Sequence, residues 1–240
     1  MADPNARRIP WLRVFVESFV IVVSILLAFG IDAWWDVRQQ EEHFRTALAG
    51  LESGYAEHLR RIDANIDYVS NDQQRLRSFI NMDPLEASRI PAESTWGTLQ
   101  SIWRPGTEDN NITFLTSALA DESLALRGDV RLHEAVAAWQ TVVDELRERV
   151  VQMAVAEREA LRAVARYPGV RSALARPSEG DPGGPPTVNG EVMRRVREDQ
   201  EVMAVAGMKI FHSRIHRQTL RELRVAAELV LDLVRAAQSR

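Results

Sequence analysis

Two histidines near the carboxyl-terminal end of the chain have the spacing that a helical metal site uses. His212 and His216 are four residues apart, so on a helix they share one face, and imidazole nitrogens are common zinc ligands. No third ligand stands nearby in the sequence, and Arg214 and Arg217 flank the pair. We therefore interpret the pair as partly exposed histidines on a basic face, with a metal site as the alternative, and expect no cofactor.

Other chemical patterns are missing from the sequence. No serine–histidine–aspartate order, phosphate-cradling glycine loop or glycosidase-like pair of carboxylates stands out, so we expect no enzyme. Arginine outnumbers lysine by 29 to one, but the formal net charge is −4 and acidic residues interleave with the arginines. We therefore expect no nucleic-acid partner. The absence of cysteine excludes disulfides and thiolate metal sites.

One carboxylate, Glu17, lies inside a strongly apolar segment. Residues 11–35 read WLRVFVESFVIVVSILLAFGIDAWW, and residues 18–31 carry no charge. As a helix, residues 11–34 rise about 34 Å, enough to cross a hydrocarbon core about 30 Å thick. The segment predicts a transmembrane helix. A cleaved signal peptide is the alternative, because residues 28–30 (AFG) have the small residues of a cleavage site.

Tryptophans mark both ends of this segment, and an acidic face runs along it. Tryptophan side chains favour the membrane interface, so we predict three interface anchors: Trp11, Trp34 and Trp35. At about 100° per residue, one face of the helix carries Glu17, Ile21, Ser24, Ala28 and Asp32. This face predicts a helix–helix contact in the membrane, because small residues allow close approach. Alternatively, the Glu17 side chain reaches the interface, about 9 Å from Trp11.

Basic residues on either side of the segment indicate its orientation. Arg7, Arg8 and Arg13 lie before the uncharged core, and Arg38 and Arg45 are the nearest basic residues after it. The positive-inside rule then predicts a cytoplasmic tail at residues 1–10, a transmembrane helix at residues 11–35 and an extracytoplasmic bundle at residues 36–240. In a Gram-negative cell, this places a single-pass protein in the inner membrane with its bulk in the periplasm.

The apolar segment also resembles a known family. Residues 17–34 (ESFVIVVSILLAFGIDAW) are similar to the opening of bacterial single-span membrane proteins that are described only as a domain of unknown function. Residues 96–101 (WGTLQS) are similar to a second stretch of that family, but WWD at residues 34–36 replaces the common Asn-Trp-Asn. The resemblance implies a single-pass anchor followed by a helical domain. It implies no activity, substrate or catalytic residue.

Apolar residues spaced by three and four predict three long helices. They cover residues 35–82, continuous with the apolar segment, then about 129–166 and 190–238. Short helices are predicted at residues 94–103 and 112–124, with a loop at 104–111 and a flexible Pro/Gly-rich loop at 167–189. The predicted fold is all-α: a transmembrane helix continuing into an antiparallel bundle of three long helices, with short helices at the distal end.

Short connections favour an up-down-up order of the long helices, which would place the Pro/Gly loop near the bilayer. An intermolecular coiled coil is the competing arrangement.

Two functions fit these features. The first is a membrane-anchored interaction or scaffold protein that self-associates. The second is a sensory or accessory subunit that binds a ligand in a pocket lined by Trp96, Trp103 and Trp139 and couples through the Glu17 face. The expected partners are the lipid bilayer and either a second copy or another membrane protein.

Overall fold

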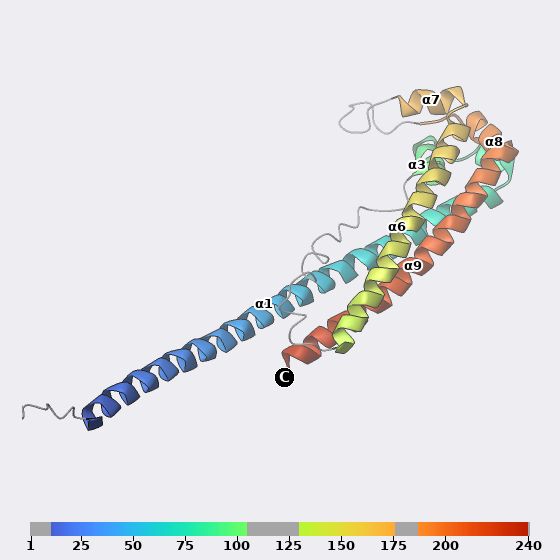
Figure 1. Ribbon diagram of the computed structural model, residues 1–240. Helices are drawn as coiled ribbons and strands as arrows, with labels where there is room; N and C mark the ends of the chain where they lie inside the picture. The colour runs from blue at the N-terminus through green and yellow to red at the C-terminus, as the bar shows by residue number, and fades with distance from the viewer. Residues whose placement is uncertain (1–10, 105–129, 176–186, 240) are drawn as a thin grey trace, which may run out of the picture.

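The computed structural model describes residues 11–104, 130–175 and 187–239, and this part of the chain contains helices and no strand. The predicted all-α fold is confirmed. The helices, labelled in Figure 1 where there is room, are α1 (Trp11–Asn81), α2 (Pro84–Ala87), α3 (Ala92–Trp103), α6 (Val130–Val164), α7 (Pro168–Leu174), α8 (Gly190–Glu198) and α9 (Gln200–Gln238).

Helix α1 is continuous over 71 residues, which corresponds to about 107 Å at 1.5 Å per residue. No proline interrupts the sequence between Pro10 and Pro84, so the backbone hydrogen-bond ladder has no obligatory break. Figure 1 shows the amino-terminal half of α1 projecting away from the other helices, and the side chains of residues 15–40 are all exposed. By length and composition, α1 is the one helix of the described chain that is suited to cross a membrane.

The carboxyl-terminal half of α1 forms a three-helix bundle with α6 and α9. Helix α9 packs against both other long helices. The buried apolar residues fall into two groups. The base cluster contains Leu48, Leu51, Tyr55, Ile62, Val69, Leu132, Ala135, Trp139, Val143, Leu146, Leu220, Leu223, Ala227, Val230, Leu231 and Val234. The tip cluster contains Leu76, Phe79, Ala87, Leu99, Ile102, Ala160, Ala163, Val164, Val170, Ala173, Val188, Met193, Val196, Val202 and Ala206.

The two clusters fix the direction of each long helix. Residue numbers rise from the base cluster to the tip cluster along α1 and along α6, and they fall along α9. Helix α6 therefore runs parallel to α1, and α9 runs antiparallel to both. The predicted up-down-up order is wrong; the observed order is up, up, down. An amphipathic stripe has the same spacing in either direction, so the stripe on α6 carried no information about its polarity.

The short helices α2, α3, α7 and α8 gather at the tip of the bundle (Figure 1). Because α6 ends at the tip, the segment that follows it also begins there. The predicted position of the loop at residues 167–189 near the bilayer is therefore wrong for its described residues. Part of that range is the helix α7, which has Pro168 in its first turn. Proline is tolerated there because the first amide groups of a helix have no intrahelical partner. Residues 176–186 lie outside the described part.

Several boundaries also differ from the prediction. The predicted helix 190–238 is divided at Asp199, whose carboxylate accepts hydrogen bonds from the amides of Glu201 and Val202 and so caps α9. Helix α3 begins at Ala92, directly after Pro91, and not at Ser94. The predicted helix at residues 112–124 lies outside the described residues, as does the loop at 104–111 except for Arg104.

The close approach of α8 to the residue after α2 gives a stability test. A methyl group added at Gly190 would lie 2.0 Å from the backbone oxygen of Ser88, which is far inside van der Waals contact. We expect Gly190→Ala to lower the free energy of unfolding by about 1–3 kcal/mol, because the two backbones must separate. Urea denaturation followed by circular dichroism measures this.

Gly207→Ala is the matched control. Gly207 is exposed on α9, and an added methyl group there has no neighbour within 4 Å. This variant should raise the free energy of unfolding by about 0.5–1 kcal/mol through helix propensity. Wild-type stability of Gly190→Ala would contradict the close backbone approach.

Candidate functional site

The predicted contact face of the apolar segment lies on the projecting half of α1. Glu17, Ile21, Ser24, Ala28 and Asp32 are all exposed. Ser24 donates its hydroxyl proton to the carbonyl of Val20 at 2.8 Å, which satisfies this polar group within the helix. No described helix packs over this face. Its role as a contact face therefore stays a prediction.

The predicted anchors Trp34 and Trp35 lie where the apolar segment ends. Their side chains are 58% and 61% exposed, and their ring centroids are 6.4 Å apart. The Arg38 guanidinium lies over the Trp34 ring at 5.6 Å, a cation–π contact. The side chain of Trp11 lies outside the described part. Beyond these tryptophans, residues 36–43 are exposed except for the half-buried Glu41, and Phe44 packs against the base cluster.

The two histidines with metal-site spacing have different surroundings. His216 is buried in the bundle, and neither of its ring nitrogens has a hydrogen-bond partner among the described residues. His212 is partly exposed and contacts the ring edge of Phe211. Among the described residues, no group of three histidine, cysteine, aspartate or glutamate side chains has the geometry of a metal site. The interpretation of both as partly exposed histidines is wrong for His216.

Polar side chains occupy interior positions in the middle of the bundle. The buried residues of α9 include an unbroken three-and-four series: Val202, Ala206, Lys209, Ser213, His216, Leu220, Leu223, Ala227, Val230 and Val234. Lys209, Ser213 and His216 take the places of apolar residues in this series. On α1, the buried polar residues are His58, Asn65, Asp72 and Gln73. Asp72 and Gln73 lie between the two clusters, as do Lys209, Ser213 and His216, and together they form a polar band; His58 and Asn65 lie among the α1 residues of the base cluster.

Lys209, the single lysine of the chain, is fully buried and fully hydrogen-bonded. Its ammonium group donates to Asp72 Oδ2 at 2.9 Å and to the carbonyls of Ser101 and Arg104 at 2.7 and 2.8 Å. These three bonds use every proton of the ammonium group. Carbonyls at the end of α3 lack intrahelical partners and favour a positive charge. Lys209 therefore joins α1, α3 and α9, and its geometry is that of a structural residue.

Two buried imidazoles are held neutral. Burial lowers the pKa of His216 to about 4. Burial, with a smaller contribution from the charge of Arg61, lowers the pKa of His58 to about 4. His58 packs edge-on against Trp139 at 5.7 Å, as Tyr55 does at 5.3 Å. At neutral pH, neither histidine adds a charge to the core.

The tryptophans predicted to line one ligand pocket are in different places. Trp96 and Trp103 pack against each other at 5.5 Å beside the tip cluster. Trp139 is fully buried in the base cluster. The prediction of a shared pocket is wrong, because α3 and the first half of α6 lie at opposite ends of the bundle.

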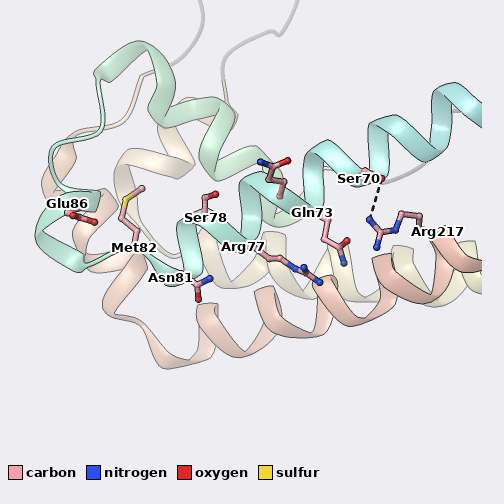
Figure 2. A pocket seen from close by; sticks show the side chains of 9 residues that line it. Ser70, Gln73, Arg77, Ser78, Asn81, Met82, Glu86 and Arg217 are labelled. Atoms are coloured by element: carbon pink, nitrogen blue, oxygen red, sulfur yellow. Dashed lines mark hydrogen bonds between the residues drawn. The ribbon is translucent and has the colours of Figure 1, made fainter.

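An open groove of about 710 Å³ lies where α1 and α9 meet, toward the tip (Figure 2). Most of its lining comes from polar side chains of α1: Ser70, Gln73, Gln74, Arg77, Ser78 and Asn81. Met82 and Glu86 line the tip end, and Arg217 enters from α9. Gln73 donates to the carbonyl of Ile210 at 3.2 Å, which connects α1 to α9 beside the groove.

The groove has a positive character. Arg217 donates to the Ser70 hydroxyl at 3.4 Å, while Ser70 donates its own proton to the carbonyl of Ile66. Partial burial lowers the pKa of Arg217, and the charges of Arg221, Arg77 and Arg214 lower it further. None of these four arginines forms an ion pair within the described residues.

Sequence reasoning missed both the polar band and the groove. Polar residues in a three-and-four series resemble a gap in an apolar stripe. Arg77 and Arg217 both line the groove. They are distant in the sequence and come close only when α9 packs on α1. The available signal was the spacing of Lys209, the single lysine of the chain, which places it on the same helix face as Val202 and Ala206.

Comparisons of the sequence with protein-family models, with curated proteins and with solved structures find no match. The resemblance of residues 17–34 to a family of single-span proteins therefore stays a prediction.

The ion pair between Asp72 and Lys209 gives a test of the polar band. Asp72→Leu leaves the buried ammonium group without its carboxylate, so we expect a loss of about 3–5 kcal/mol in the free energy of unfolding. Adding Lys209→Met removes the uncompensated charge, and the double variant should recover at least half of that loss. A double-mutant cycle by urea denaturation measures both effects, and equal stability of the single and double variants would contradict the assignment.

Proposed function

We propose that this protein is a membrane-anchored interaction protein that self-associates through its apolar helix. In this account, residues 11–35 span the inner membrane, residues 1–10 lie in the cytoplasm and the bundle lies outside. The observation that carries the proposal is the continuity of α1, which is apolar and exposed at one end and forms one side of the bundle at the other.

Exposed apolar surface supports the membrane anchor. The large side chains between Phe15 and Ile31 are 43–70% exposed, and they surround the helix on all sides. A contiguous apolar surface of this size is unfavourable in water, whereas lipid satisfies it and the helix satisfies its own backbone. The tryptophan pair at residues 34 and 35 fits the interface that follows.

The Glu17 face supports self-association. A carboxylate at membrane depth favours a protein partner, and Ser24 and Ala28 on the same face allow a second helix to approach closely. A second copy supplies an identical face, so a twofold pair brings like residues together. The continuous α1 would then hold two bundles side by side outside the bilayer.

An accessory subunit that couples a bound ligand to another membrane protein is the second candidate. The groove between α1 and α9 favours it, because this groove is open and polar. The same Glu17 face would then contact the other protein.

Single cysteines test the contact face, since the chain has no cysteine of its own. We expect Ser24→Cys to form a disulfide-linked dimer in native membranes under mild oxidation. Leu26→Cys, on the opposite side of the helix, is the matched control and should form little dimer. Glu17→Gln in the Ser24→Cys background should reduce the dimer fraction at least twofold. Non-reducing electrophoresis measures each result.

Three outcomes decide among the alternatives. Equal cross-linking at residues 24 and 26, or cross-linking unchanged by Glu17→Gln, would contradict the contact face. A cross-linked species that contains a different protein favours the accessory subunit. Loss of the first thirty residues from the mature chain, detected by intact mass, would show signal-peptide cleavage and overturn the anchor.

A further inference from the structure

We call the line of contact between α1 and α9 the seam. Outside the groove, two arginines of α9 form ion pairs across this seam with carboxylates of α1. At the base, Arg235 contacts Glu52 at 2.8 Å, and further toward the tip Arg224 contacts Asp63 at 2.8 Å. In both pairs α1 supplies the acid and α9 supplies the base. These pairs neutralise the lower part of the seam.

The pattern changes at the groove. Arg217 is the next arginine of α9 to reach across the seam, but α1 offers it the hydroxyl of Ser70. Beyond it, α1 contributes Arg77, a second cation. Arg214 and Arg221 are close enough for their charges to act on Arg217. The groove thus concentrates positive charge, and none of the α1 residues that line it is a carboxylate.

The rest of the lining indicates what kind of molecule fits. The hydroxyl and amide groups of Ser70, Gln74, Ser78 and Asn81 donate and accept hydrogen bonds. The groove has one acidic residue, Glu86, and one apolar residue, Met82, and both line its tip end. Its volume of about 710 Å³ is in the range of small-molecule sites. An apolar ligand would find little surface to bury.

We propose that this groove binds a small polar anion carrying two or more phosphate or carboxylate groups, with Arg77 and Arg217 as its main contacts. Guanidinium groups match the planar geometry of such oxyanions and form charge-assisted hydrogen bonds with them. Glu86 would repel the anion at the tip end and so favour binding at the arginine end.

The groove belongs to the bundle, so its charge is the same whether or not α1 spans a bilayer. If residues 11–35 do span a membrane, Arg77 lies about 63 Å beyond Trp35 along α1. Headgroups of the host membrane are then out of reach, and a dissolved anion is the source.

Isothermal titration of the full chain in a nonionic detergent tests the proposal, with inorganic pyrophosphate and citrate as probes. We expect saturable binding of one molecule per chain by at least one probe, weakened by added salt. Pyrophosphate binding more tightly assigns the site to phosphates, and citrate binding more tightly assigns it to carboxylates. Arg217→Gln and Arg77→Gln should each weaken binding at least tenfold, because each removes a charge-assisted contact.

Arg224→Gln is the matched control, since it removes the same charge from the same seam outside the groove. It should leave the affinity within about twofold of wild type. Arg77 is exposed and forms no ion pair within the described residues, so Arg77→Gln should fold. This variant still tests the site if Arg217→Gln does not fold. Equal weakening by Arg224→Gln would overturn the site, as would binding of neither probe. Polyglutamate is a third probe. If it binds and neither small anion does, the small-anion site is overturned, and an acidic protein segment is the favoured ligand.

Discussion

The buried face of α9 is the interaction on which the structure depends. It packs against α1 on one side and α6 on the other, and its interior series is apolar at both ends. Most helical stability in proteins comes from the packing of an amphipathic face, so α1 and α6 need this partner to cover their apolar stripes. Without α9, the carboxyl-terminal half of α1 would lose the helix against which most of its buried face packs.

The polar middle of α9 gives the packing its register. An apolar stripe alone tolerates a slip of one helical turn, because similar side chains meet again after the slip. Such a slip would separate Lys209 from Asp72 and from the two carbonyls of α3, leaving a fully buried charge without partners. A polar residue at an interior position fixes register in coiled coils in the same way. The positions of Arg217 and Arg77 across the seam follow from this register.

The features that the sequence could predict are those encoded locally. The continuity of α1 and the extent of α6 follow from periodicity and from the positions of proline. The direction of α6 was not predictable, because a stripe of apolar residues has no polarity. His58, Asn65 and Asp72 resemble surface residues until a partner helix covers them, and the arginine groove exists only after α9 packs on α1. The division at Asp199 was within reach, since aspartate is a common cap at the start of a helix.

The continuity of α1 connects the apolar segment directly to the bundle and to the groove. A pair of spin labels at Gly30→Cys and Asp67→Cys, both exposed positions on a chain without cysteine, measures it by pulsed electron spin resonance in lipid nanodiscs. Dilution with unlabelled chain removes distances between copies. An unbroken helix predicts a narrow distribution centred at about 56 Å. A broad distribution, or one centred well below this value, would contradict a single helix that runs from the apolar segment into the bundle.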